Sequence, residues 1–242
     1  MRNTIHFVLQ AKGGIGKSFV STLLAQHLLA ETSAVRCFDT DQENTTFTHY
    51  EALGVRHVAV TNQSRLIDPK KFDLLMETLL TEEGNFVIDT GANTFSNFLA
   101  YMVENEVFPM LQDAGKTTYI HTIVGGGDTL ADTANGFHAI AQKVNGTRLV
   151  LWFNEHFGDI KTAEGKPFVE TQAYRQSAGK LAGVVTLYRR NAATYGEDIR
   201  KLNTKRHTVA QALASAEYSL MEKQRIKTFS REIFGQLKAL AW

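Results

Sequence analysis

Short runs of β-branched and aromatic residues alternate along the chain with longer segments in which apolar residues recur every three or four positions. The strand candidates are Ile5–Leu9, Val35–Phe38, Val55–Val60, Phe86–Ile88, Thr118–Val124, Leu149–Phe153 and Val184–Leu187. Strands that alternate with helices form right-handed β-α-β crossovers. The pattern therefore predicts an α/β fold of three layers, αβα, with a mostly parallel central sheet and ligands at the carboxyl ends of its strands.

The end of the chain, residues 208–242, has a helical pattern. Apolar residues follow one another there along a single stripe, at Ile226, Phe229, Ile233, Leu237 and Leu240. We expect this stripe to pack on the sheet. Because no proline-rich linker or repeat interrupts the sequence, residues 1–242 are predicted to form a single domain with a helical C-terminal end.

Composition narrows the class of protein only slightly. The 242 residues are 43% hydrophobic, which is enough for a full core, and 26 Lys and Arg balance 25 Asp and Glu. Cys37 is the sole cysteine, which excludes an internal disulfide and fits a reducing compartment. The apolar start Ile5–Leu9 is too short for a signal peptide, and no later run could span a membrane. We therefore expect a cytoplasmic protein.

A glycine-rich segment follows the first strand candidate and reads Lys12-Gly13-Gly14-Ile15-Gly16-Lys17-Ser18, with Phe19 next in a predicted helix that opens at Lys17. Glycines in such a loop let backbone N–H groups converge on phosphate oxygens at a helix N-terminus. Lys17 is expected to reach the β- and γ-phosphates of ATP, and the Ser18 hydroxyl to bind Mg²⁺. The sequence thus predicts a P-loop NTPase fold. A glycine-rich turn without nucleotide is the alternative, since Ala11 replaces the first glycine of the usual motif.

The second lysine of this loop, Lys12, gives the segment a more specific resemblance. The pattern KGGxGKS resembles the deviant P-loop of the ParA/MinD-type ATPases. That resemblance implies an ATP-dependent homodimer in which Lys12 reaches the partner's nucleotide and stabilises charge there, as a catalytic residue beside Lys17. A solvated lysine is the alternative.

Acidic residues follow the second strand candidate as Asp39-Thr40-Asp41-Gln42. The segment resembles the acidic switch of the same family, although family members usually carry a proline before the glutamine. The resemblance implies that Asp41 orients the attacking water and that Asp39 supports Mg²⁺. Carboxylates just after a strand suit a hard cation that keeps part of its water shell. A solvated acidic turn is the alternative.

Two further strand ends carry candidate site residues. Phe86–Ile88 ends at Asp89, as a strand that holds Mg²⁺ through its carboxyl end requires. The continuation through Gly91 and Ala92 resembles the family's second switch, which implies that this turn senses the γ-phosphate. Asn154 follows Leu149–Phe153, and in the family an asparagine at this place binds adenine. Helix capping by Asn154 is the alternative.

Several stretches also resemble the TraL proteins of conjugative plasmids, among them VLQAKGGIGKS, CFDTDQENTTF, VIDTGANTF, LQDAGK and TYGEDI. This branch implies a role in plasmid transfer, with conjugation or partition proteins as partners. Partition-type relatives bind DNA nonspecifically, and a basic C-terminal surface could do so here. Its candidates are Lys201, Lys205, Arg206, Lys223, Arg225, Lys227 and Arg231. Membrane association through the terminal helix is not expected, because core packing explains its apolar stripe.

Three functions remain open at this point. The first is a dimeric switch that binds ATP and hydrolyses it slowly. The second is a small-molecule ligase or kinase of the dethiobiotin synthetase type, against which the acidic segment at Asp39 and Asp41 argues. The third is a scaffold that binds nucleotide without hydrolysis, and the presence of Asp41 weighs against it.

Overall fold

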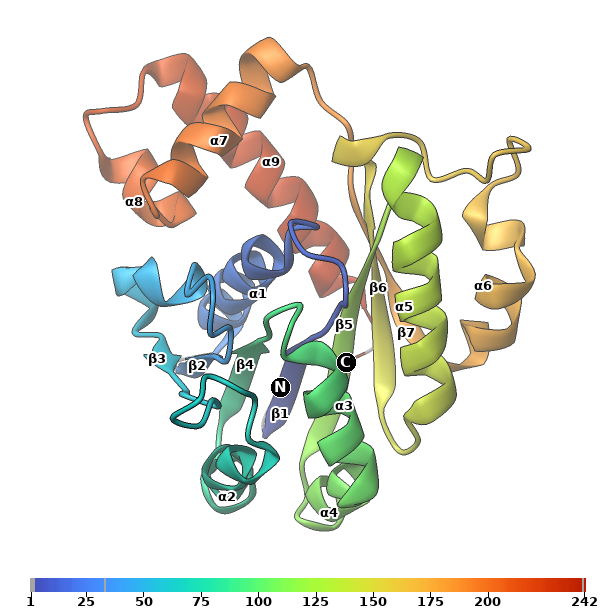
Figure 1. Cartoon of the computed structure of the whole chain (residues 1–242). Helices are drawn as coiled ribbons and strands as arrows, with labels where there is room; N and C mark the ends of the chain where they lie inside the picture. Colours follow the sequence, from blue (N-terminus) through green and yellow to red (C-terminus); the bar gives the residue numbers. More distant parts are fainter. Residues whose placement is uncertain (1–2, 33, 241) are drawn as a thin grey trace.

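The computed structural model describes residues 3–32, 34–240 and 242, and within them it contains one seven-stranded sheet (Figure 1). The strands are β1 Thr4–Val8, β2 Val35–Asp39, β3 Arg56–His57, β4 Asn85–Asp89, β5 Thr117–Gly125, β6 Arg148–Asn154 and β7 Leu181–Leu187. Their order is β3-β2-β4-β1-β5-β6-β7, and every neighbouring pair is parallel. The predicted α/β class is confirmed, and the carboxyl ends of all strands meet at one edge.

Helices cover both faces of this sheet. They are α1 Lys17–Glu31, α2 Asp73–Thr81, α3 Phe95–Glu104, α4 Val107–Asp113, α5 Leu130–Lys143, α6 Gln172–Ser177, α7 Glu197–Thr204, α8 Val209–Ala214 and α9 Leu220–Lys238. The helices α2 to α6 lie on one face, and α1 and α9 lie on the other (Figure 1). The expected three-layer αβα architecture is therefore present.

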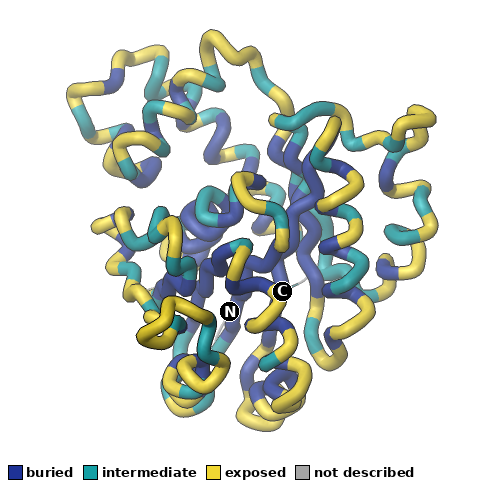
Figure 2. Tube along the Cα trace, viewed as in Figure 1, coloured by how far each residue is buried: buried dark blue, intermediate teal, exposed yellow. Residues whose placement is uncertain are grey.

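Alternating side chains of the strands supply two cores, one for each face. On β1, Ile5 and Phe7 enter the core under α2 to α5, whereas Val8 enters the core under α1 and α9. Because a strand sends successive side chains to opposite faces, a strand buried on both sides becomes apolar almost throughout. Figure 2 shows the result as a continuous buried sheet between partly exposed helices.

The C-terminal end of the chain divides between the sheet and a separate small core. In α9 the residues Phe229, Ile233 and Leu237 are buried against the sheet face that α1 also covers, as expected, whereas Ile226 of the predicted stripe packs in a separate cluster. Residues 197–226, which we call the helical lobe, contain α7, α8 and the start of α9 and form their own cluster. The lobe lies beyond the carboxyl edge of the sheet, at the upper left of Figure 1.

The edge strand β3 is shorter than the predicted Val55–Val60. From the Val58 carbonyl onward the segment bonds to the side chain of Gln42 instead of to the backbone of β2. The Gln42 amide donates to the carbonyl of Val58 at 2.9 Å, and its oxygen accepts the N–H of Val60 at 3.1 Å. The segment is extended there, but only Arg56–His57 pairs with β2 as a strand. Sequence periodicity detects apolar alternation and cannot distinguish these two kinds of partner.

A buried chain of polar groups crosses the face of the sheet under α1 and α9. Trp152 Nε1 donates to His121 Nδ1 at 3.0 Å, so the neutral His121 ring carries its proton on Nε2. That proton is donated to His6 Nδ1, 3.0 Å away. The other nitrogen of His6 donates to Thr4 Oγ1 at 3.0 Å, and the Thr4 hydroxyl donates to Asn85 Oδ1 at 2.8 Å. Each ring is therefore satisfied only in its neutral form.

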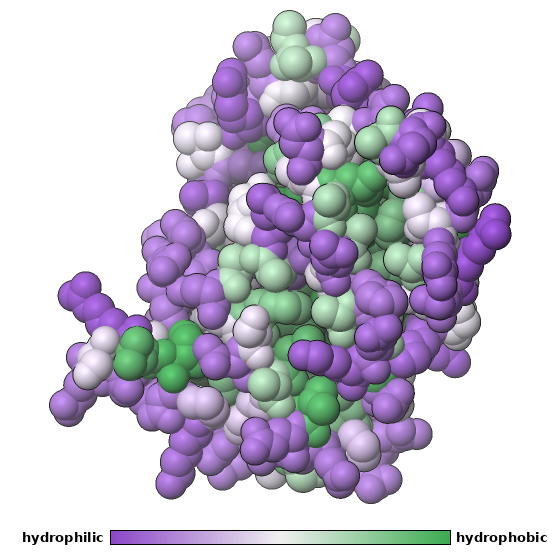
Figure 3. All heavy atoms as spheres, turned by 45° about the vertical axis from the view of Figure 1, so that its right-hand side comes forward, coloured by the Kyte–Doolittle hydropathy of each residue, from purple (hydrophilic) through white to green (hydrophobic). Residues whose placement is uncertain are grey.

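The surface of the molecule is mostly polar. Figure 3 shows a largely hydrophilic face, with apolar atoms gathered near its middle and in one protrusion at the left. The most exposed large apolar side chains, Leu220 and Leu74, are 85% and 72% exposed. Within the described part of the chain, no helix combines the length and apolar character needed to cross a membrane.

We predict that acid destabilises the fold through the histidine chain. Burial lowers the pKa of His6 from 6.5 to about 3, and burial beside His6 lowers the pKa of His121 well below its ordinary value. Below pH 6.5 these two histidines therefore bind more protons in the unfolded chain than in the folded one, and their contribution to stability falls as the pH falls. Urea unfolding at about pH 7.5 and about pH 5 measures this difference.

The double variant His6→Gln, His121→Gln should show a smaller difference between the two pH values. The control is His49→Gln, because His49 is exposed and its removal should leave the pH dependence as it is. A double variant with the same pH difference as the unmodified protein would contradict the prediction.

Candidate nucleotide site

The predicted P-loop connects the central strand β1 to α1 at the carboxyl edge of the sheet. Helix α1 begins at Lys17, and its N-cap is Gly16, whose left-handed backbone (φ 101°) strongly favours glycine. No described side chain caps the first turn, and that turn contains no acidic residue. The N–H groups at the start of α1 are therefore available to an anion, which the helix dipole would also attract.

Lys17 is the buried cation of this loop. Its side chain is 7% exposed, and its Nζ donates to the carbonyl of Lys12 at 3.0 Å. Burial lowers the pKa of Lys17, while the carboxylates of Asp89 and Asp41 act in the opposite direction. The loop thus holds a desolvated ammonium group that its own backbone only partly satisfies, as a phosphate-binding lysine requires.

A cavity of about 460 Å³ opens in front of the loop. Four parts of the chain that are distant in sequence form its wall: the P-loop with the start of α1, the segment after β2, the turn after β4, and the end of α7. The lining residues are Gly13, Gly14, Gly16, Lys17, Ser18, Phe19, Asp41, Glu43, Asn44, Thr46, Tyr50, Ala92, Asn203 and Arg206. Most of the predicted phosphate-binding residues, and Asp41, therefore share one cavity.

Asp89 lies behind the loop at the end of β4, completely buried. Its Oδ1 accepts the hydroxyl of Ser21 at 2.8 Å, while its buried Oδ2 has no hydrogen-bond partner among the described residues. Burial raises the pKa of Asp89 to about 7, against the opposing effect of the nearby Ser18 hydroxyl. An unpaired buried carboxylate oxygen is costly, so Oδ2 is suited to a metal-bound water or a cation.

The two acids after β2 differ in their surroundings. Asp39 is buried, and its carboxylate accepts the N–H of Asp41 at 2.9 Å and both the N–H and the hydroxyl of Thr48 at 3.1 Å. Burial nevertheless raises the pKa of Asp39. Asp41 lines the cavity, and its Oδ1 accepts the N–H groups of Glu43 and Asn44. Asp39 therefore shapes the segment, and Asp41 is the acid that faces the open space.

Asn154 contacts the P-loop but does not line the cavity. Its Nδ2 donates to the carbonyl of Ile15 at 3.0 Å, and its Oδ1 accepts the N–H of His156 at 3.2 Å. The second contact caps the short helix Glu155–Phe157, so the capping role of Asn154 is present. Its adenine contact stays a prediction.

Lys12 and Phe19 make contacts that attach the loop to neighbouring helices. Lys12 Nζ lies 2.7 Å from Asp132 Oδ2, and the two side chains are 41% and 60% exposed. An exposed pair of this kind is worth at most about 1 kcal/mol, so Lys12 can exchange partners easily. The ring of Phe19 stacks on Phe229 of α9 with centroids 6.0 Å apart. The role of Lys12 across a dimer interface stays a prediction.

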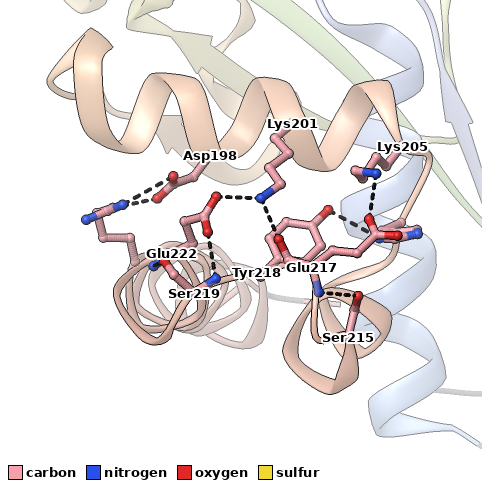
Figure 4. A network of polar contacts seen from close by, with 10 residues as sticks. Asp198, Lys201, Lys205, Ser215, Glu217, Tyr218, Ser219 and Glu222 are labelled. Atoms are coloured by element: carbon pink, nitrogen blue, oxygen red, sulfur yellow. Dashed lines mark hydrogen bonds and ion pairs between the residues drawn. The ribbon is translucent and has the colours of Figure 1, made fainter.

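The basic surface predicted for DNA is partly neutralised within the helical lobe. Lys201 pairs with Glu222, Lys205 with Glu217, and Arg225 with Asp198 (Figure 4). Arg206 belongs to the cavity wall instead. Four of the candidate DNA-binding residues therefore have other roles, and DNA binding stays a prediction that the remaining Lys223, Lys227 and Arg231 would have to carry.

Sequence reasoning missed several residues of the site. Ser21 follows the P-loop motif, and only its distance to Asp89 shows its role. Tyr50, Asn203 and Arg206 come from segments that no motif marks, and the fold brings them together. The Tyr50 hydroxyl donates to Asn203 Oδ1 at 3.2 Å over a sequence separation of 153 residues. No signal within a single sequence reports such a contact.

The fold and the loop together define a P-loop protein of the MinD and ParA type. A chain of the MinC:MinD cell division protein complex of Aquifex aeolicus matches 96% of this chain and 96% of its own length, at 12% identity and a TM-score of 0.51. Two proteins TraL of Escherichia coli are each 36% identical to it over 238 residues, which cover 98% of both sequences. The chain belongs to the TraL family, as its sequence stretches indicated.

A nucleotide-binding protein from Archaeoglobus fulgidus in complex with ADP covers 85% of this chain and 87% of its own, at 19% identity and a TM-score of 0.45. No protein-family model matches the chain. At 12% identity the similarity to the chain of the MinC:MinD complex establishes the fold alone.

We predict that Ser21→Ala destabilises the protein by about 1–3 kcal/mol, because it removes the hydrogen-bond donor to a buried carboxylate. Urea unfolding at about pH 8, where Asp89 is mostly ionised, measures the loss. The control is Ser230→Ala: Ser230 is also a buried serine of a helix, but its hydroxyl donates only to the Lys227 carbonyl. Equal losses in the two variants would show that the bond to Asp89 contributes nothing.

Proposed function

We propose that the protein is a dimeric switch of the ParA/MinD type that binds ATP and hydrolyses it slowly. The observation that carries the proposal is the buried ammonium group of Lys17 beside the uncapped first turn of α1. In this arrangement Gly13, Gly14 and Gly16 offer backbone N–H groups to phosphate oxygens, and Lys17 moves from the Lys12 carbonyl to the phosphates.

The residues around the loop also suit Mg²⁺. Ser18 lines the cavity, and the unpaired Oδ2 of Asp89 lies behind the loop as an acceptor for a metal-bound water. Asp39 acts less directly, because both of its oxygens already hold the segment after β2. The described residues include no group of three or more acids, histidines or cysteines that could hold a metal. The phosphates and water therefore supply most of the ligands, as is usual for Mg²⁺.

The proposed hydrolysis needs no covalent intermediate with the protein. Asp41 faces the cavity and would orient the attacking water. Lys17 and the backbone N–H groups would stabilise the charge that develops on the transferred phosphoryl group. Lys12 would leave Asp132 and serve the nucleotide of a second subunit, which is possible at low cost because the ion pair is exposed.

The setting of this switch follows from the family. We place the protein in the cytoplasm, where its nucleotide state would control contact with proteins of plasmid conjugative transfer or partition. A ligase or kinase of the dethiobiotin synthetase type is less well supported, because it does not account for the acidic segment at Asp39 and Asp41, which resembles the switch of the ParA/MinD-type ATPases. A scaffold without hydrolysis would leave Asp41 only its structural contacts with the backbone of Glu43 and Asn44.

Sizing the protein by light scattering with ADP, with ATP, and with ATP plus duplex DNA tests the proposal. We expect a monomer with ADP, a dimer with ATP, and Lys17→Ala to lose ATP binding by at least about a hundredfold. Lys12→Ala is the matched lysine variant, and it should bind ATP as a monomer without forming the dimer.

Retention of ATP affinity in Lys17→Ala would show that the site lies elsewhere. The variant Asp41→Ala should hydrolyse ATP more slowly than the unmodified protein and so trap the dimer. If both proteins bind ATP but remain monomeric, the dimeric switch is contradicted. Phosphate release with and without DNA distinguishes the switch from a scaffold and from a transferase.

We predict that Gly91→Ala slows hydrolysis without preventing binding. A methyl group at position 91 would lie 2.8 Å from Asp41 Cγ and 2.7 Å from Asn93 Oδ1, so the Asp41 carboxylate must move. Misplacing a water-orienting group should lower the rate of phosphate release about tenfold or more. The control is Gly179→Ala, where the added methyl group meets no atom within 4 Å. An unchanged rate in Gly91→Ala would exclude Asp41 from water positioning.

A further inference from the structure

The helical lobe contributes to the nucleotide cavity through the residues at the end of α7. Arg206 and Asn203 line the cavity together with the P-loop. Tyr50 is 2% exposed and supports both: its hydroxyl donates to Asn203, and its ring centre lies 6.0 Å from the Arg206 guanidinium carbon. A cation from a distant part of the chain thus lies on the same cavity wall as Lys17.

The backbone at Arg206 is unusual for a residue with a side chain. Helix α7 ends with the N–H of Arg206 on the carbonyl of Asn203 and the N–H of His207 on the carbonyl of Leu202, both at 3.2 Å. This termination requires a left-handed residue, which is usually glycine, and Arg206 has a φ of 54°. An arginine is less favourable here than glycine, so its presence suggests that the side chain has a task.

The charges of the lobe single out the same residue. The neighbouring cations Lys201, Lys205 and Arg225 are each paired with a carboxylate of the lobe (Figure 4). Arg206 has no ion pair with any residue that the structure describes. It is not paired even with Asp41 or Glu43, the two acids that line the same cavity. A guanidinium group at a cavity wall without a carboxylate partner is available to an anionic ligand.

We propose that Arg206 binds the phosphate groups of the nucleotide held by the P-loop of the same chain. The proposal rests on the function proposed above and adds a residue to its site. A guanidinium group donates two parallel hydrogen bonds to phosphate oxygens, which makes arginine suited to this task. Tyr50 and Asn203 position the group, and the lobe becomes the part of the molecule that responds to an occupied site.

The variant Arg206→Gly tests this role against a purely structural one. Glycine is favoured at a left-handed helix end, so the variant should be at least as stable as the unmodified protein in urea. Its affinity for ATP, measured by calorimetry, should fall about tenfold or more. The matched control is Lys205→Ala, which removes the adjacent positive charge, already paired with Glu217, and should leave ATP affinity unchanged.

The outcomes separate this inference from the proposed function. ATP binding that is lost in Lys17→Ala and unchanged in Arg206→Gly overturns the role of Arg206 and leaves the nucleotide site intact. An unmodified protein that binds no ATP overturns both. If Arg206→Gly does not fold, Arg206→Asn replaces it, because asparagine also tolerates the left-handed conformation. A fall in ATP affinity equal to that of Lys205→Ala also overturns the proposal.

Discussion

The burial of the Lys17 ammonium group is the constraint on which the rest of the site depends. A positive charge removed from water must be compensated nearby, and here the compensation comes from the Lys12 carbonyl and from two carboxylates at the carboxyl edge of the sheet. Asp89 is the last residue of β4 and Asp41 follows β2, so the parallel order of the sheet brings both carboxylates to the lysine. The fold therefore assembles charges that are far apart in sequence around a single buried group.

Much of the site could be predicted because its chemistry is local. The P-loop needs glycines at fixed positions before a helix, and the structure begins α1 at Lys17 with Gly16 as its left-handed N-cap. Six of the seven predicted strands lie within three residues of their predicted bounds, and the agreement is better for the inner strands, which are buried on both faces and therefore largely apolar, than for the edge strand β7. The exception, β3, is short because the Gln42 side chain takes the place of a backbone partner. Local patterns do not describe such contacts.

The contribution of the helical lobe could not be predicted for a related reason. Arg206 stands in a run of basic residues whose composition indicates a charged surface, and only the fold separates it from Lys201 and Lys205. Its left-handed backbone conformation has no sequence signal, because the position carries no glycine. The contact between Tyr50 and Asn203 joins the segment after β2 to the lobe and depends wholly on tertiary structure. Long-range polar contacts are thus the part of the site that sequence alone leaves undetermined.

The amide of Gln42 joins two parts of the molecule that would otherwise be independent. The residue follows Asp41 directly, and its side chain is bonded to the backbone of Val58 and Val60 beside the outermost strand. The acid at the cavity and the edge of the sheet are consequently one mechanical unit: the segment after β2 cannot shift without breaking bonds at that edge. A movement of this segment at the cavity would therefore leave the backbone groups of Val58 and Val60 at the sheet edge without their hydrogen-bond partner.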